Sequence, residues 1–213
     1  MKPKILFLTD SVSLPRRKSH EHYVEWESIF ISKFRSEYPE YEIIQLAIGG
    51  ATIKDLFNQS NYYSILNLHT VILQCGIVDC TPRAFGRLEL EIIKKIRLFR
   101  FTKPLVKTLR RYRAHRYTSP KKFKKYLLDL REKLNAQNFY ALSILPSNPE
   151  YEVKAPSITR NIETYNNILK SNVDYIDLSS IPRQGILEDH HHINEIGHNY
   201  IFKKLVEVID ARK

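Results

Sequence analysis

The sequence predicts an α/β fold in which helices cover both faces of one parallel sheet. Five apolar stretches of strand length alternate with amphipathic segments of helical period along most of the chain. Strands that alternate with helices in this way pair in parallel, because each helix carries the chain back to the same edge of the sheet. A chain of 213 residues, 43% of them hydrophobic, suits a single domain, 1–213, with a sizeable core.

The predicted strands are short and apolar. The first covers residues 5–8 and runs directly into Thr9-Asp10-Ser11. A polar residue at that position lies at the carboxyl edge of the sheet, where open α/β sheets bind their ligands. The other predicted strands cover residues 41–47, 70–74, 139–145 and 173–178.

Apolar residues at helical spacing predict the helices between these strands. Ser19 is a suitable N-cap for a helix that continues to about Ser36, with Tyr23 and Trp26 on its core-facing side. A later helix is expected over 119–134, and the last over about 195–211. Further helices are expected to begin at Ile53, Thr102 and Ile158.

The net charge of +11 is concentrated in one part of the chain. The segment from Lys94 to Lys125 contains 14 Lys and Arg residues and no Asp or Glu, which leaves 20 basic and 23 acidic residues elsewhere. Residues 85–134 also have a helical pattern that is longer than a strand-to-strand crossover requires. We therefore expect a basic helical insertion at about 85–134 on an otherwise nearly neutral domain.

This basic segment is compatible with three partners: an anionic membrane surface, an acidic glycan or nucleic acid. Each Lys or Arg near an anionic bilayer contributes about 1 kcal/mol of attraction. Phe99, Leu105 and Leu109 lie between the charges and suit an interfacial helix. Nucleic acid is the least favoured partner, since no recognised nucleic-acid-binding motif accompanies the charge. A solvated helical face explains the same pattern without any partner.

Nothing in the sequence predicts secretion or membrane spanning. The apolar run after Met1 stops at Thr9 and lacks a small-residue cleavage site, and no run approaches the ~18 apolar residues of a membrane span. Cys75 and Cys80 have no metal-binding or redox spacing. These features favour a reduced, cytoplasmic protein, with peripheral contact at the inner membrane face if the basic segment binds lipid.

A short segment near the C-terminus carries residues suited to acid–base chemistry. Asp189 precedes His192 by three residues, so the two can lie on one turn. The carboxylate then orients the imidazole and leaves its other nitrogen free to act as a general base. Such a base needs a nucleophile, and Ser11 at the end of the first strand is the candidate. The alternative is an ordinary turn serine and a surface histidine.

These segments and two others between them resemble the four sequence blocks of the SGNH (GDSL-type) hydrolases. Thr9-Asp10-Ser11 is similar to the family's Gly-Asp-Ser, and Gly50 to the glycine of its second block. Gly76-Ile77-Val78-Asp79 is similar to its Gly-x-Asn-Asp. The blocks occur in the family's order and span nearly the whole chain. The last block, Asp-x-x-His followed by x-Asn-x-x-Gly-His, matches Asp189, His192, Asn194, Gly197 and His198.

The resemblance implies a flavodoxin-like three-layer α/β/α fold with the strand order 2-1-3-4-5 and a Ser-His-Asp esterase. Ser11 would be the nucleophile, His192 the base and Asp189 the carboxylate that orients it. The backbone N–H groups of Ser11 and Gly50 would stabilise the oxyanion. No cofactor or metal is expected, because the three adjacent histidines 190–192 cannot all face one ion.

The chain departs from the family at Val78, which stands where the family's asparagine donates the third oxyanion hydrogen bond. Valine has no donor, which leaves three alternatives. Arg83 or Gln74 supplies the missing hydrogen bond, or the enzyme is slow or favours transfer to a bound sugar alcohol. In the third alternative the fold serves binding alone. Asp79 is either a helix cap or a substrate contact. Arg83 is either its ion-pair partner or a second substrate contact.

The third block, read as Gly-x-x-Asp-Cys-x-Pro-Arg, also resembles SGNH proteins from bacterial surface-polysaccharide loci. This resemblance favours a serine hydrolase that cleaves or transfers an O-acyl ester, most simply acetyl, on a carbohydrate. The substrate would be anionic or lipid-linked if it contacts the basic segment. The alternative is a non-catalytic or weakly catalytic SGNH-fold protein that binds an anionic glycan or a membrane surface.

Overall fold

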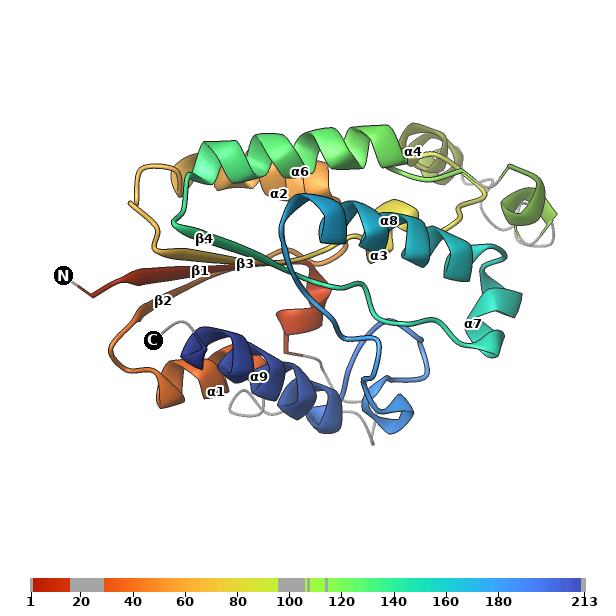
Figure 1. Cartoon of the computed structure of the whole chain (residues 1–213). Coiled ribbons are helices and arrows are strands. Elements are labelled where there is room, and N and C mark those ends of the chain that lie inside the picture. Colours follow the sequence, from red (N-terminus) through yellow and green to blue (C-terminus); the bar gives the residue numbers. More distant parts are fainter. Residues whose placement is uncertain (1, 16–28, 96–105, 107, 114, 212–213) are drawn as a thin grey trace.

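The structure is a computed structural model that describes residues 2–15, 29–95, 106, 108–113 and 115–211. Its centre is a five-stranded parallel sheet with the order β2-β1-β3-β4-β5 (Figure 1). The predicted fold class and strand order are therefore confirmed. The strands are β1 (Lys4–Thr9), β2 (Glu42–Ala47), β3 (Thr70–Gln74), β4 (Asn138–Leu142) and β5 (Asp174–Ile176).

Strand β1 is apolar on both of its faces because helices cover the sheet from both sides. Leu6 and Leu8 point into one core, whereas Ile5 and Phe7 point into the other, and all four are fully buried. Such a continuous hydrophobic run is what a parallel strand needs when neither of its faces meets water.

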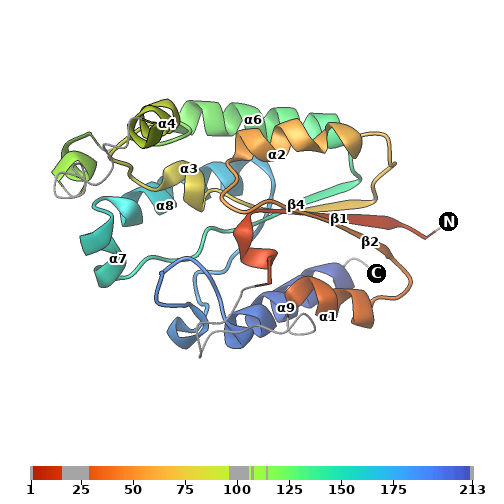
Figure 2. The same cartoon turned by 180° about the vertical axis from the view of Figure 1, so that it is seen from behind.

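Different sets of helices cover the two faces of the sheet. One layer contains α2 (Ile53–Gln59), α3 (Ile77–Cys80), α6 (Pro120–Leu134) and α8 (Ile158–Asn172). The other contains α1 (Phe30–Glu37) and α9 (Glu195–Asp210), which pack against each other on the opposite face of the sheet (Figures 1 and 2). The remaining short elements are η1 (Ser11–Ser13), η3 (Ser60–Tyr62), α4 (Arg87–Lys95), α7 (Pro149–Lys154) and η4 (Arg183–Gly185).

Three predicted boundaries are wrong, for local reasons. A helix from Ser19 through residue 29 is excluded, because Ile29 has an extended backbone (φ −68°, ψ 132°) and α1 begins at Phe30. Residues 16–28 lie outside the described part of the chain. The fourth and fifth strands end early because side chains take backbone N–H groups that would continue them: Asn166 binds that of Ile144, and Ser143 that of Leu178.

The predicted insertion at 85–134 is too wide at its C-terminal end. Helix α6 belongs to the helical layer, since its apolar face is buried in the core. The helix begins where the sequence predicts, and Ser119 caps it, with its hydroxyl accepting from the Lys122 N–H. Between α3 and α6 the structure describes α4 and the helical residues 108–113, and an insertion there stays a prediction. The helix start predicted at Thr102 lies outside the described residues.

The basic residues of this region do not form one free surface. Arg113 pairs with Glu89, and Lys125 with Asp129. Contact with an anionic membrane stays a prediction, and it depends on fewer unpaired charges than the sequence count suggests. Over the residues that the structure describes, we find no helix with the length and apolar character that crossing a bilayer requires. Exposed lysines on the outer side of α6 are Lys121, Lys122 and Lys124.

The start of α9 is fixed by a close backbone approach to η4. A Cβ added to Gly197 would lie 2.5 Å from the Gly185 carbonyl oxygen and 2.6 Å from Ile193 Cβ. The Asn194 side chain accepts from the N–H groups of Ile196 and Gly197, at 3.0 and 3.3 Å. Asn194 therefore caps α9, and Gly197 in its first turn allows the helix to approach η4.

Replacing Gly197 with alanine should destabilise the fold, because the added methyl group forces the η4 backbone away from α9. We expect Gly197→Ala to lower the free energy of unfolding by ~1–3 kcal/mol, the range for overpacked cores, in urea denaturation. Lys203→Ala, at an exposed position of the same helix, is the control and should change stability by less than ~0.5 kcal/mol. Equal stability of the two variants would contradict this account of the glycine.

Candidate active site

Ser11 lies in the turn that follows the central strand. Asp10 caps η1, with its Oδ1 atom accepting from the Val12 N–H at 3.0 Å. Ser11 is half-buried at the carboxyl edge of the sheet. Ser13 is fully buried instead, and its hydroxyl is hydrogen-bonded to Thr9. The turn therefore offers the hydroxyl of Ser11, and not that of Ser13, to the edge of the sheet.

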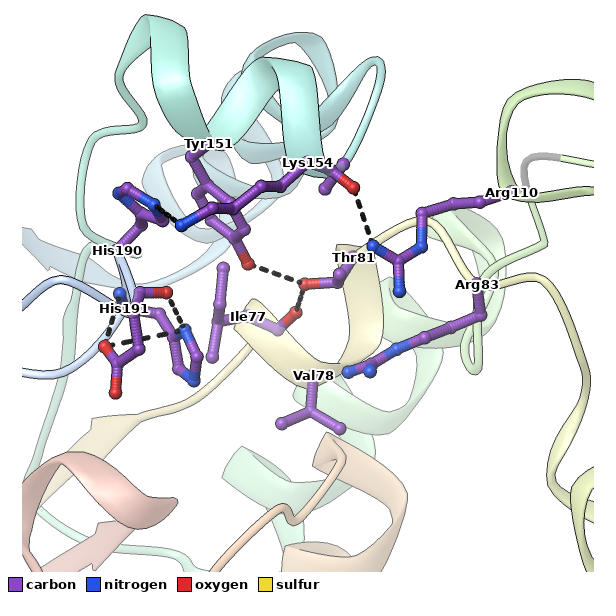
Figure 3. Close-up of a pocket in the computed structure, with 11 residues that line it drawn as sticks. Ile77, Val78, Thr81, Arg83, Arg110, Tyr151, Lys154, His190 and His191 are labelled. Carbon is purple, nitrogen blue, oxygen red and sulfur yellow. Dashed lines mark hydrogen bonds and ion pairs between the residues drawn. The ribbon is translucent and has the colours of Figure 1, made fainter. Parts of the chain in front are cut away.

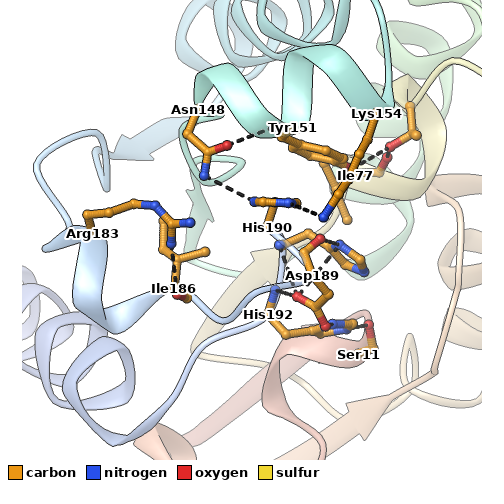
Figure 4. Close-up of polar contacts among 12 residues, drawn as sticks. Ser11, Ile77, Asn148, Tyr151, Lys154, Arg183, Ile186, Asp189, His190 and His192 are labelled. Atoms are coloured by element: carbon orange, nitrogen blue, oxygen red, sulfur yellow. Dashed lines mark hydrogen bonds and ion pairs between the residues drawn. The ribbon is translucent and has the colours of Figure 1, made fainter.

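The structure joins Ser11, His192 and Asp189 in one chain of hydrogen bonds (Figure 4). Ser11 Oγ lies 2.7 Å from His192 Nε2, and His192 Nδ1 lies 2.6 Å from Asp189 Oδ2. The other carboxylate oxygen of Asp189 accepts from the His192 backbone N–H at 3.0 Å. The spacing of three residues thus fixes both the ring and the backbone of His192.

The environment of Asp189 favours its charged form. Burial alone would raise the pKa of Asp189, but the hydrogen bond from the His192 ring and the charges of His192 and His191 together lower it well below its usual value. An ionised carboxylate can only accept, so Nδ1 of His192 carries the hydrogen. When the imidazole is neutral, Nε2 presents a lone pair to the Ser11 hydroxyl, the arrangement that a general base requires.

Two of the predicted oxyanion donors lie in neighbouring loops. Thr9 pairs with Ala47 across β1 and β2, so the turns that carry Ser11 and Gly50 leave the sheet side by side. The backbone N–H groups of Ser11 and Gly50 have no acceptor among the described residues. Their binding of an oxyanion stays a prediction.

The third block places Val78 beside the same edge. Gly76 turns β3 into α3 with φ +118°, and a Cβ there would lie 2.6 Å from Ile144 Cδ1. Only glycine satisfies both the left-handed backbone and the close contact. Val78 follows in α3 and presents no hydrogen-bond donor to the site.

Comparison with known proteins identifies the fold. No family model and no curated protein matches the sequence, but solved structures match over nearly its whole length. A lipase/acylhydrolase from Enterococcus faecalis aligns over 99% of this chain and 96% of its own, with a TM-score of 0.69 and 14% identity. A lipolytic protein of the G-D-S-L family from Veillonella parvula aligns over 96% and 97% (TM-score 0.61, 12% identity). The chain has the SGNH hydrolase fold.

A third structure with the SGNH fold is a carbohydrate acetylesterase family member from Sinorhizobium meliloti. It aligns over 97% of both chains, with a TM-score of 0.65 and 10% identity. At such identities the likeness concerns the fold, and the chemistry must be inferred from the side chains of this chain.

A pocket of about 280 Å³ adjoins the hydrogen-bonded residues (Figure 3). The loop before α9 forms one wall, α3 a second, and α7 with the segment between α3 and α6 the rest. The pocket opens next to His192, because Asp189 and His191 line it. Its other lining residues are Ile77, Val78, Thr81, Arg83, Arg110, Tyr151, Lys154, Ala155 and His190.

The predicted substrate contact through Asp79 is wrong. Asp79 is fully buried, and its carboxylate accepts from the Ile53 N–H at the start of α2, at 3.1 and 3.3 Å. Its carboxyl group therefore joins α3 to the first N–H of α2, a helix whose N-cap is Thr52. Arg83 forms no ion pair with Asp79 within the described residues, and its guanidinium lies over the Tyr117 ring, 5.0 Å from the centroid. Arg83 lines the pocket, so its role as a substrate contact stays a prediction.

The sequence did not mark Tyr151, Lys154 or Arg110 as site residues, although all three line the pocket. Tyr151 and Lys154 lie one turn apart on α7, which the pair Asn148-Pro149 could have predicted as an N-cap followed by proline. Arg110 comes from residues 108–113, and nothing in its local sequence distinguishes it from the other basic residues around it.

Two further groups of reactive side chains have simpler explanations. Ligand atoms of Asp189, His191 and His192 lie within 4.8 Å of one another. A metal ion there would have to displace the hydrogen bond between Asp189 and His192, and the absence of a metal stays a prediction. Burial raises the thiol pKa of both Cys75 and Cys80, so neither offers a thiolate near neutral pH.

Asp79 should give the folded protein a measurable pH dependence. Burial raises the pKa of Asp79 to about 7, against hydrogen bonds from Thr118 and Ile53 that lower it. The folded protein keeps a proton that the unfolded chain releases near pH ~4, so stability falls as the pH rises from about 4 to about 7. Asp79→Asn removes this titration. Between about pH 5 and about pH 8, the free energy of unfolding should therefore fall less in the variant than in the wild type, by on the order of 1–3 kcal/mol.

Urea unfolding at the two pH values measures this difference. Asp174→Asn is the control, because Asp174 is exposed, and its pH slope should equal that of the wild type. A wild-type slope in Asp79→Asn would show that Asp79 ionises as an ordinary carboxylate.

Proposed function

We propose that the protein is an SGNH-type serine esterase that removes a small acyl group, most simply acetyl, from a carbohydrate or transfers it to another alcohol. The observation that carries this proposal is the contact of Ser11 Oγ with His192 Nε2 at 2.7 Å, continued to Asp189 at 2.6 Å. Solved structures of the same fold include a lipase/acylhydrolase and a carbohydrate acetylesterase family member, which supports ester chemistry.

In this proposal the reaction has two halves. His192 Nε2 takes the Ser11 proton as Oγ attacks the ester carbonyl, and Asp189 stabilises the imidazolium that forms. His192 then protonates the leaving sugar oxygen, which leaves an acyl group on Ser11. Water or a second alcohol, activated by the same imidazole, attacks the acyl group and restores the free hydroxyl.

The oxyanion site would be weaker than that of a three-donor enzyme. The backbone N–H groups of Ser11 and Gly50 supply two donors, and Val78 supplies none. Loss of one donor costs ~10²–10³ in rate in a serine hydrolase. Arg83 is the better candidate for a replacement because it lines the pocket, whereas Gln74 is buried outside that lining. Without a replacement, the enzyme should be slow, a property compatible with acyl transfer.

The pocket favours a sugar over a long acyl chain. Its lining includes the charged groups of Arg83, Arg110 and Lys154, which a fatty chain would have to desolvate. The third block's resemblance to proteins of bacterial surface-polysaccharide loci supports a polysaccharide ester as the substrate. We assign the enzyme to the cytoplasm on the sequence features alone.

Replacement of each member of the hydrogen-bonded chain should remove most activity. We expect Ser11→Ala, His192→Ala and Asp189→Ala to lower kcat on a soluble acetyl ester by roughly 10³-fold or more, with far from additive effects, because the three groups act together. Circular dichroism should show that each variant is folded. Ser13→Ala should keep wild-type kcat, because its hydroxyl faces Thr9. Full activity in Ser11→Ala would exclude it as the nucleophile, and an inactive wild type would favour a binding protein.

Val78→Asn tests the missing oxyanion donor. If Ser11 and Gly50 are the only donors, an asparagine amide at this position should raise kcat by a factor on the order of 10, with ~10²–10³ as the ceiling. The gain should fall in kcat more than in KM, since the bond strengthens only as negative charge develops. Val78→Leu, which is similar in size to asparagine but has no donor, is the control and should not raise kcat. An unchanged or lower rate in Val78→Asn, with a loss in Arg83→Ala, would show that Arg83 already fills the role.

A further inference from the structure

Three basic side chains line the pocket, and they outnumber its acidic residues. Arg83, Arg110 and Lys154 line it from three different segments of the chain (Figure 3). Within the described part of the protein, Asp189 is the one acidic residue that lines it. Its carboxylate already accepts from the ring and the backbone of His192. The pocket therefore carries an excess of positive charge.

A neighbouring arginine shows what these side chains lack. Arg113, three residues after Arg110, forms two hydrogen bonds to the Glu89 carboxylate at 2.8 and 3.1 Å. Among the residues that the structure describes, no carboxylate forms such an ion pair with Arg83, Arg110 or Lys154. The basic segment around Arg110 cannot supply one either, since its sequence contains no acidic residue.

Partial burial makes the unpaired charges of the two arginines costly. The Nε atoms of Arg83 and Arg110 are buried and lack a hydrogen-bond partner in the described part of the chain. Burial is the larger cause that lowers the pKa of Arg110, and the charge of Arg83 lowers it further. The two guanidinium groups therefore repel each other. An anion bound between them would offset this repulsion and supply the missing acceptors.

The three groups are also held in place. Arg110 donates from Nη1 to the Lys154 carbonyl oxygen at 2.6 Å, and the Arg83 guanidinium rests on the Tyr117 ring. Lys154 Nζ lies 2.8 Å from His190 Nε2 (Figure 4). Burial is the larger cause that lowers the pKa of His190, and the charge of Lys154 lowers it further. The ring in its neutral form can accept a hydrogen bond from Lys154 Nζ. Donors fixed in this way bind an anion with little loss of side-chain freedom.

We propose that Arg83, Arg110 and Lys154, here termed the cationic pocket, bind a carboxylate or phosphate group carried by the sugar that bears the scissile ester. This inference rests on the proposed esterase function and names its substrate class. Asp189 and Val78 also line this pocket and belong to the candidate active site, so the anion and the scissile ester would be parts of one bound substrate. A volume of about 280 Å³ is just below the ~300–1,000 Å³ of small-ligand pockets, which suits one acidic group rather than a long anionic chain.

The test compares three methyl glycosides that are acetylated on the same ring hydroxyls. They differ only in the exocyclic group, which is a neutral hydroxymethyl, a carboxylate or a phosphate. We expect the wild-type kcat/KM for one of the anionic esters to exceed that for the neutral ester at least about tenfold, as charged hydrogen bonds allow. In Arg110→Gln this ratio should fall to within about twofold of one. Arg111→Gln, at the exposed neighbouring position, should keep the wild-type ratio.

The outcomes separate the source of the anion from the validity of the proposal. Preference for the carboxylate identifies an acidic sugar, and preference for the phosphate identifies a phosphorylated one. A wild-type preference for the neutral ester, or an unchanged ratio in Arg110→Gln, overturns the proposal. If Arg110→Gln fails to fold, Lys154→Gln takes its place. The ratio of kcat/KM for the anionic ester to that for the neutral ester should fall in the same way.

A binding measurement keeps the cationic pocket distinguishable from the esterase function. If the wild type hydrolyses none of the three esters, its Tm is measured with glucuronate and with inorganic phosphate. A rise in Tm that is absent in Arg110→Gln supports the cationic pocket while the esterase proposal fails. No rise with either anion overturns both.

Discussion

The pairing of β1 with both β2 and β3 is the constraint on which the rest of the structure depends. Thr9, at the end of β1, pairs with Ala47 on one side and Gln74 on the other, so the three following turns leave the sheet together. Those turns carry Ser11, Gly50 and Val78. The fourth part of the site arrives from the far end of the chain, because α9 packs on α1 against the same sheet and places His192 over Ser11.

Much of the sequence pattern that resembles the SGNH family has a structural role here. Asp10 caps the turn of the serine, Asn194 caps the last helix, and Gly197 lets that helix approach η4. His198 is buried and stacks on Phe30 with ring centroids 5.8 Å apart. The chemistry is left to a few groups, and their precision comes from these supports. A catalytic hydrogen bond of the proposed kind needs such fixed neighbours, because small displacements of the reacting groups cost large factors in rate.

The features that could be predicted from the sequence are those that local sequence patterns determine. The third strand and the start of α6 follow from apolar runs at strand and helix spacing, and the meeting of Ser11 with His192 follows from the resemblance to the SGNH blocks. The sequence could not predict the burial of Asp79, because its partner is the start of a helix 26 residues earlier. Nor could it predict the cationic pocket, whose members are brought together only by tertiary packing. The alternatives that stood open for Asp79 and for the basic segment were therefore questions of burial, which periodicity alone does not answer.

The central claim is that Ser11 is a nucleophile activated by His192 and Asp189. Labelling with a serine-directed fluorophosphonate, followed by peptide mass mapping, tests it most directly. Our account predicts a single adduct on the peptide that contains Ser11, located at Ser11 by fragmentation, with labelling slowed by at least about 10²-fold in His192→Ala. An adduct at Ser13, labelling that is independent of His192, or no adduct in the folded wild type would contradict it.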